Sequence, residues 1–88
     1  MIDNYMLFNN LPTLDLHGED RISAVLKTKE FINDNLKLQN MLIIVIHGVG
    51  SGILKEEIHK YLRKEKKVKD FRLNVFNKGM TVIELEKD

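Results

Sequence analysis

The sequence predicts one small α/β domain, a two-layer sandwich with the element order β-α-β-α-β-β. Its four-stranded mixed sheet should carry both helices on one face, with the last strand antiparallel. Two segments with helical spacing of apolar residues alternate with short apolar runs, which is typical of strands joined by helical crossovers. A short turn joins the last two runs, and such a connection makes strands antiparallel. A chain of 88 residues suits two layers better than three.

The first half of the chain contains two expected strands and the helix between them. Residues 13–16 (TLDL) form a short strand that ends at His17. Asp20 is the expected N-cap of a helix over 21–38, whose apolar residues approximate helical spacing. Residues 41–46 (MLIIVI) are continuously apolar and rich in β-branched side chains, which predicts a strand buried on both faces.

The second half contains a helix and two further strands. We expect the helix over 52–66, because its apolar residues fall on one face. Alternating apolar and polar residues predict a strand over 71–75 with one wetter face. Residues 77–79 (NKG) form a turn before the last strand, 81–85. His59 lies near the polar side of the second helix, and we interpret it as structural.

Three side chains with acid–base chemistry gather at one edge of the predicted sheet. His17 follows the first strand and His47 the second, and parallel neighbours end at the same edge, where ligands of open α/β sheets usually bind. Asp15 shares a strand face with His17, so its carboxylate can reach the imidazole or a ligand. A lone histidine at a strand end is more often structural, but two at one edge favour function. We therefore expect catalytic roles for Asp15, His17 and His47 near neutral pH.

The stretch VIHGVGSGILKEE, residues 45–57, places three glycines between a strand and a helix. Glycines permit positive φ angles and let backbone N–H groups approach a ligand, and a helix N-terminus attracts anions. The spacing matches neither a Walker A motif nor a dinucleotide fingerprint. A purely structural role in tight packing is the alternative. The predicted phosphate-binding residues are Gly48, Gly50, Ser51, Gly52, Lys55 and Arg72.

Composition narrows the class of protein. The chain has no cysteine, which excludes a disulfide scaffold and a cysteine-based zinc site and is compatible with the reducing cytoplasm. No segment approaches the ~20 apolar residues of a membrane span, so we expect no membrane partner. One aspartate and two histidines make a thin magnesium site, and we expect neither a metal nor a cofactor. The net charge of +1 is too near neutral to imply a partner by itself.

Two further segments have less certain roles in the sequence. Residues 60–69 (KYLRKEKKVK) hold six basic residues at the helix end opposite the glycine loop. They are either a nucleic-acid backbone contact or a solvated helix end, where cations favour the dipole. Residues 1–12 are expected to be a leader or linker arm, and residues 13–88 the domain itself. The oligomeric state does not follow from the sequence.

Three motifs together carry a family resemblance. With LDLHG at 14–18, IHGVGSGILK at 46–55 and VKDFR at 68–72, the chain resembles a small MutS-related (Smr) domain over about 13 to 85. The resemblance implies a two-layer α/β sandwich similar to the C-terminal domain of a bacterial translation initiation factor. It also implies work on nucleic acids: members nick DNA, cleave RNA or act on stalled ribosomes.

The motifs of the family map onto specific residues of this chain. The acidic-Leu-His motif falls on Asp15, Leu16 and His17, which makes Asp15 and His17 the implied cleavage residues. The His-Gly-x-Gly motif falls on His47, Gly48 and Gly50, with the loop holding a backbone phosphate. The chain departs from the pattern in two places. Lys55 stands where the family often has arginine, and the residues NKGMT at 77–81 replace a glycine-rich stretch.

Three functions therefore compete at this stage. The first is an endonuclease that acts on DNA or RNA as a phosphodiester hydrolase or transferase. The second is a non-catalytic module that binds nucleic acid or the ribosome, within a MutS-like protein, and the short 77–81 turn favours it. The third is a protein-interaction or dimerisation domain with residues 1–12 as a contact arm.

Overall fold

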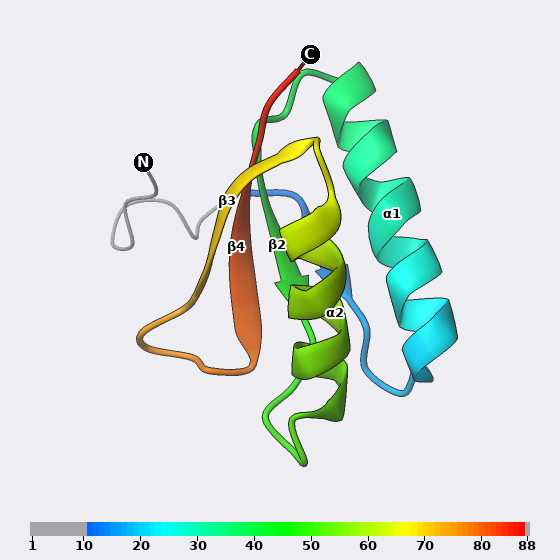
Figure 1. Cartoon of the computed structure of the whole chain (residues 1–88). Coiled ribbons are helices and arrows are strands. Elements are labelled where there is room, and N and C mark those ends of the chain that lie inside the picture. Colours follow the sequence, from blue (N-terminus) through cyan, green and yellow to red (C-terminus); the bar gives the residue numbers. More distant parts are fainter. Residues whose placement is uncertain (1–10, 88) are drawn as a thin grey trace.

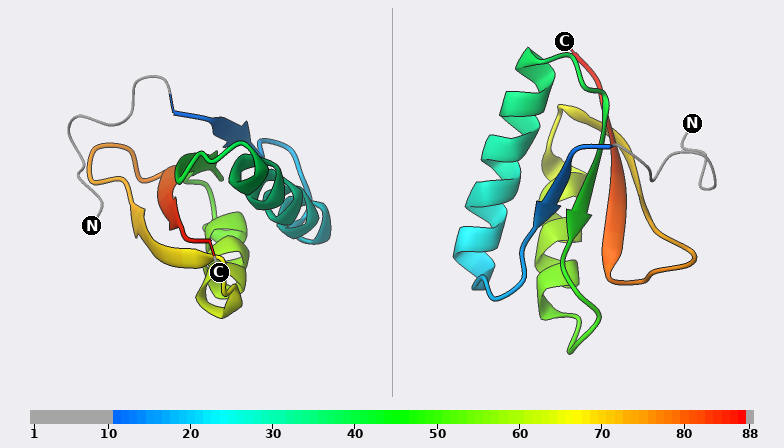
Figure 2. Two further views of the ribbon diagram at one scale, coloured as in Figure 1. Left: turned by 90° about the horizontal axis from the view of Figure 1, so that it is seen from above. Right: turned by 180° about the vertical axis from the view of Figure 1, so that it is seen from behind.

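A computed structural model describes residues 11–87 as a four-stranded sheet with two helices on one face (Figures 1 and 2). The predicted fold class and element order are confirmed. The elements are β1 (Thr13–Asp15), α1 (Arg21–Lys37), β2 (Leu42–Ile46), α2 (Ile53–Lys64), β3 (Val68–Leu73) and β4 (Met80–Leu85). Within these residues, no helix is long and apolar enough to cross a membrane.

The strands lie in the order β1-β2-β4-β3. β1 is parallel to β2, and β4 is antiparallel to both of its neighbours. The α1 crossover therefore joins adjacent strands, whereas the α2 crossover leaves a gap that β4 fills. Viewed from above, both helices lie on the same side of the twisted sheet (Figure 2). As a result, the carboxyl ends of β1 and β2 and the start of β4 meet at one end of the molecule.

The main core lies between the sheet and the helices. Alternate residues of β2 and β4 point into it, and each helix contributes one apolar face. Its buried members are Leu16, Ala24, Ile32, Leu36, Ile43, Val45, Ile58, Leu62, Ile83 and Leu85. A smaller cluster on the far face of the sheet is built on Ile44 and Val82, so β2 is buried on both faces as predicted.

The third strand differs most from its predicted position. It begins at Val68, which pairs with Leu85, and its register against β4 shifts between Val68 and Asp70. The charged residues at this shift interrupt the alternation of apolar and polar side chains, so the sequence pattern did not indicate where the strand starts. It ends at Leu73 because the buried Asn74 turns the chain. The side chain of Val75, expected in the strand, is 60% exposed. The other element ends agree with prediction to within two residues.

The entry into α1 follows local capping chemistry. The Asp20 carboxylate accepts a hydrogen bond from the Ser23 amide (2.8 Å), which confirms the predicted N-cap. This bond lowers the pKa of the Asp20 carboxyl. Most of the predicted arm, residues 1–10, lies outside the described residues. Of the rest, Pro12 extends the β1–β2 pairing, because its carbonyl accepts from the Ile44 amide at 2.9 Å.

Burial predicts a sharp difference between two isoleucines on the helices. Ile58 is fully buried in the core, whereas the Ile22 side chain is 76% exposed. Ile58→Val should lower the free energy of unfolding by about 0.5–1.5 kcal/mol, because it leaves a methyl-sized cavity. Ile22→Val makes the same change in helix propensity and should cost less than about 0.5 kcal/mol. Urea unfolding measures both, and equal effects would contradict this core.

Candidate functional site

The carboxyl ends of β1 and β2 are joined directly by backbone pairing. Asp15 is the register partner of Ile46, and the Leu16 amide donates to the Ile46 carbonyl at 2.8 Å. The two predicted motifs therefore leave the sheet side by side, as the parallel topology requires. Adjacent strands lie about 4.8 Å apart, so the backbones of Asp15–His17 and Ile46–Gly48 are neighbours.

Asp15 and His17 are exposed at this edge. The Asp15 Oδ1 accepts a hydrogen bond from the His17 amide at 2.8 Å, which folds the chain into a tight turn. The turn continues through Gly18, whose φ of +80° favours glycine. This bond holds the carboxylate in place and leaves its second oxygen facing solvent.

The two faces of the sheet separate Asp15 from His47. Ile46, the partner of Asp15, packs in the far-face cluster, so Asp15 points away from the helices. The next residue of β2, His47, points the opposite way and meets His59 of α2, with ring centroids 5.7 Å apart. Within the described residues, no hydrogen bond or ring contact joins His47 to His17. The His47 ring is buried whereas His17 is exposed, so the two imidazoles have different surroundings, and their convergence at one rim stays a prediction.

The His47 side chain is only 6% exposed, and both of its ring nitrogens are engaged. Nδ1 lies 3.0 Å from the Gly48 carbonyl oxygen, and Nε2 lies 2.8 Å from the Thr81 hydroxyl. A carbonyl only accepts, so Nδ1 carries the proton, and Nε2 of the neutral ring accepts from Thr81. The ring is therefore buried beside the glycine loop, and the catalytic role expected of His47 stays a prediction.

The Thr81 hydroxyl extends this chain of hydrogen bonds to α2. His59 Nε2 lies 2.7 Å from the same oxygen, so it donates the proton that Thr81 accepts. The His59 ring also packs edge-on against Phe71, with centroids 4.9 Å apart. The three polar side chains thus form one array of hydrogen bonds, in which His59 donates to Thr81 and Thr81 donates to His47.

This array holds both imidazoles neutral at pH 7. Burial lowers the pKa of His47, and the Lys55 charge lowers it further, although the bond to Gly48 opposes the shift. Burial, together with the charges of His47, Lys55 and Arg63, lowers the pKa of His59 to about 4. The hydrogen bonds assigned above require an unprotonated Nε2 on His47, and the lowered pKa values favour this neutral form.

The glycine loop is tied to the start of β4. The amides of His47 and Gly48 both donate to the Gly79 carbonyl, at 2.8 and 2.9 Å. One amide expected in the phosphate cradle, that of Gly48, is therefore already used. Gly48 and Gly52 both adopt φ of +82°, whereas Gly50 does not have a positive φ.

Beyond Gly48 the loop leaves its backbone donors available. Gly52 starts α2 with no side-chain cap, and the first amides of a helix have no intrahelical acceptor. The Ser51 hydroxyl meets only the Ile53 amide, at 3.4 Å. Within residues 11–87 no acceptor is bonded to the amides of Val49, Gly50, Ser51 and Gly52. This run of donors at a helix N-terminus has the chemistry of an anion site.

The predicted cations lie in different places. Lys55 stands in the first turn of α2, close enough for its charge to act on the buried His47 ring and on the half-buried His59 ring. Arg72 is the register partner of Val82, which belongs to the far face, and its Nε lies 3.5 Å from Asp70. Arg72 therefore shares a sheet face with Asp15, three strands away, and does not reach the glycine loop.

The family follows from comparison with known proteins. The model of the Smr domain family matches residues 14–86. The chain belongs to the Smr domain family. The "Endonuclease MutS2" of Caldanaerobacter subterraneus is 36% identical over 77 residues, which are 84% of this chain and 10% of that protein. The "Endonuclease MutS2" of Streptococcus gordonii is 39% identical over 74 residues, 80% of this chain and 9% of that protein. The chain thus spans about a tenth of the length of these relatives.

Two solved structures share the Smr fold. The crystal structure of the Smr domain of Thermus thermophilus MutS2 superposes with a TM-score of 0.85 at 26% identity, covering 88% of this chain and all of that one. YdaL, a stand-alone small MutS-related protein from Escherichia coli, gives a TM-score of 0.79 at 18% identity, covering 85% of this chain and 64% of that one. The second likeness shows the fold alone.

The basic cluster of this Smr domain spans three parts of the fold. Lys60, Arg63 and Lys64 lie on α2, Lys66 and Lys67 lie in the turn after it, and Lys69 lies on β3. Lys67 donates to Asn33 at 2.6 Å, and Lys69 lies 3.8 Å from Glu84. The cluster stands at the end opposite the glycine loop, as the sequence predicts (Figure 1).

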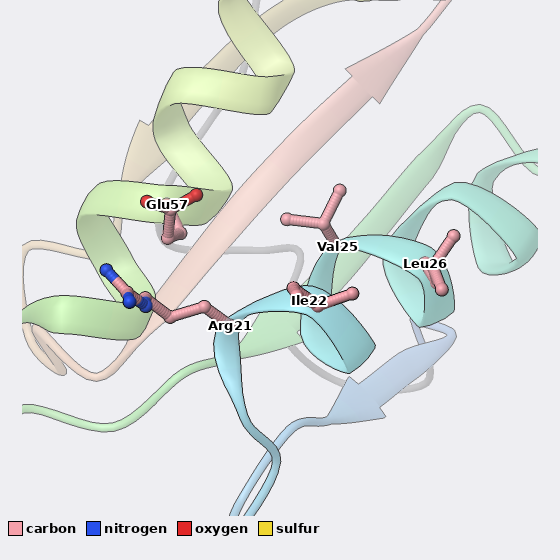
Figure 3. Close-up of a pocket in the computed structure, with 5 residues that line it drawn as sticks. All are labelled: Arg21, Ile22, Val25, Leu26 and Glu57. Carbon is pink, nitrogen blue, oxygen red and sulfur yellow. The ribbon is translucent and has the colours of Figure 1, made fainter.

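The Smr domain also has a hollow away from the glycine loop. A groove of about 390 Å³ runs between α1 and α2, lined by Arg21, Ile22, Val25, Leu26 and Glu57. Figure 3 shows Arg21 extending from α1 towards α2, near Glu57. None of the predicted site residues lines this groove. Among residues 11–87, no group of three or more histidine, aspartate or glutamate side chains is placed to hold a metal.

Sequence reasoning missed His59 and Thr81 as partners of His47. Two signals pointed to them. Thr81 lies on the same face of β4 as Ile83 and Leu85, which is the face that the helices cover. His59 follows the fully buried Ile58, at the boundary of the apolar face of α2 rather than on its polar side.

The array predicts acid sensitivity. An unfolded histidine titrates near pH 6.5, whereas folded His59 titrates at about 4. Between these values the unfolded chain binds more protons, so stability is full above about pH 6.5 and falls as the pH drops towards 4. Urea unfolding at several pH values should show this loss, reduced in His59→Gln and retained in His17→Gln, whose ring is exposed. Equal pH dependence in all three proteins would contradict the array.

Proposed function

We propose that this chain is a nucleic-acid-binding endonuclease domain that cuts the phosphodiester backbone of DNA or RNA in the cytoplasm, without a bound cofactor. The named activity of its MutS2 relatives supports the reaction class. The observation that carries the proposal is the bond from the Leu16 amide to the Ile46 carbonyl. It makes the backbones of Asp15–His17 and Ile46–Gly48 neighbours, which supports a site shared by the exposed pair and the loop that follows Gly48.

The glycine loop supplies binding. The free amides of residues 49–52 and the N-terminus of α2 present partial positive charge to a backbone phosphate. Lys55, in the first turn of that helix, adds a full positive charge. A cation at this position is repelled by the positive end of the helix dipole. An anionic ligand offsets this repulsion. Phosphate contacts of this kind carry affinity without sequence information.

Asp15 and His17 supply the chemistry. A neutral His17 imidazole takes a proton from water or from a ribose hydroxyl, and the activated oxygen attacks phosphorus. The new P–O bond forms as the P–O bond to the leaving oxygen breaks, and that oxygen takes up a proton. The Asp15 carboxylate, held by the His17 amide, is the acidic partner in this step. His47 acts as a positioning residue, because its buried ring holds the loop and does not reach solvent.

Binding of nucleic acid without cleavage is the second candidate function, and two features of the site favour it. One Asp15 oxygen already serves the turn, and the residues NKGMT stand where the family often has a glycine-rich stretch. Both features favour a module that binds nucleic acid or the ribosome without cutting, within a longer MutS-like protein. The two functions share the phosphate loop and differ only at Asp15 and His17.

Cleavage separates the two functions. His17→Ala and Asp15→Asn should each slow cleavage of single-stranded RNA, duplex DNA or nicked DNA by about 10²–10⁴-fold, since each removes an acid–base group. Binding, measured by fluorescence anisotropy, should change little and should weaken steeply with salt. Asp34→Asn, an exposed carboxylate on α1, is the matched control and should cleave normally. Identical cleavage by all variants would reveal contamination, and salt-dependent binding without cleavage would establish the second function.

Gly50 tests the phosphate loop independently of catalysis. Its φ is not positive, and a Cβ placed there meets no atom within 4 Å. Gly50→Ala should therefore leave the melting temperature unchanged or slightly raised. If backbone donors grip a phosphate, the new methyl group blocks that approach and nucleic-acid affinity should fall about 10-fold or more. Unchanged affinity would place the nucleic acid elsewhere on the domain.

A further inference from the structure

The exposed apolar side chains of the domain fall into two groups. Among the described residues, three of the large ones lie on α1 or at its C-terminal end. The other four lie in residues 48–53 and 74–79. The first group is Ile22, Leu26 and Leu38, and the second is Val49, Ile53, Val75 and Phe76. The most exposed of all is Phe76, at 83%. An apolar group that large, left in water beside a candidate site, is a marker of binding.

A well-bonded turn presents Phe76. The buried Asn74 side chain accepts hydrogen bonds from the amides of Phe76 and Asn77, at 2.8 and 3.3 Å. Asn77 in turn accepts from the Gly79 amide at 3.0 Å, and its carbonyl accepts from Met80 at 3.1 Å. The backbone under the ring is therefore ordered before any ligand arrives, which reduces the entropy lost on binding.

The same turn is in contact with the glycine loop. A Cβ added at Gly79 would lie 3.3 Å from the Gly48 Cα, so the two backbones touch. Consecutive Cα atoms are about 3.8 Å apart, which places the Phe76 Cα within about 11 Å of that of Gly79. Both loops lie at the same end of the molecule (Figure 1). A strand held at the glycine loop would bring a neighbouring nucleotide within reach of the ring.

The charges around the ring favour a nucleotide over an apolar protein surface. Residues 48–55 and 74–80 contain no carboxylate, and each segment contains one lysine, Lys55 and Lys78. The free amides and the lysines suit the phosphate of a nucleotide, and the aromatic ring suits its base. Every base has a π-face, and stacking on an aromatic side chain is tolerant of sequence.

We propose that Phe76 is a base-stacking platform, and that the preferred ligand of this domain is single-stranded nucleic acid with an unpaired base on that ring. The proposal rests on the nucleic-acid binding proposed above and names its substrate class. In a duplex each base is already stacked between its neighbours, and exposing one costs a few kcal/mol. An aromatic platform therefore favours single strands, loops and frayed ends over intact duplex.

The absence of tryptophan from the sequence makes a direct test simple. Phe76→Trp introduces a single indole at the platform, and Ile22→Trp places one at a similarly exposed position on α1. Titration with a short oligothymidylate should quench the fluorescence of the Phe76→Trp protein and leave that of Ile22→Trp unchanged. An intact duplex of equal length should quench the Phe76→Trp protein much less at the same concentration.

Affinity gives the second readout. Phe76→Leu keeps an apolar side chain and removes the ring, and should weaken oligothymidylate binding by roughly 5- to 100-fold by anisotropy, with duplex binding nearly unchanged. Because the ring is exposed, the circular dichroism spectrum should not change. Salt-sensitive binding with neither quenching nor an effect of Phe76→Leu would overturn the platform and leave the proposed function standing. Absence of binding to every nucleic acid would overturn both, and point to a protein partner for Phe76.

Discussion

One carbonyl oxygen, that of Gly79, organises the candidate site. It accepts hydrogen bonds from both the His47 and Gly48 amides, so the turn before β4 clamps the loop after β2. The clamp exists because β4 pairs antiparallel with β2, with Met80 opposite Ile46. Close backbone contact between Gly48 and Gly79 leaves no room for a side chain at Gly79 without local adjustment. The glycine loop, the array of His47, Thr81 and His59, and the turn that carries Phe76 all depend on this junction.

The buried polar array extends the same junction into the core. Polar groups inside a protein destabilise it unless they are paired, and here the Thr81 hydroxyl pairs with both imidazoles. With both of its nitrogens engaged, His47 has no proton to exchange with a ligand in solvent. The structure therefore buries His47 beside the loop and leaves Asp15 and His17 exposed. That separation is the physical basis of the function proposed for this Smr domain.

Much of the fold was predictable because its signals are local. The apolar run at 41–46, the helical spacing of residues 21–38 and the Asp20 cap each report on a few neighbouring residues. β3 was displaced because Lys69 and Asp70 interrupt the alternation where the strand shifts register against β4. The ends of β1 and β2 do meet, but Asp15 and His47 point to opposite faces of the sheet, because adjacent residues of a strand alternate.

The sequence by itself determined the element order, the family, the strand-end positions of Asp15, His17 and His47, and the glycine loop before α2. Each of these depends on spacing along the chain. Only the tertiary structure decided that β4 lies between β2 and β3, that Thr81 bonds both His47 and His59, and that the turn carrying Phe76 touches the glycine loop. These are contacts between residues distant in sequence, and they depend on which face each side chain takes once the sheet has formed.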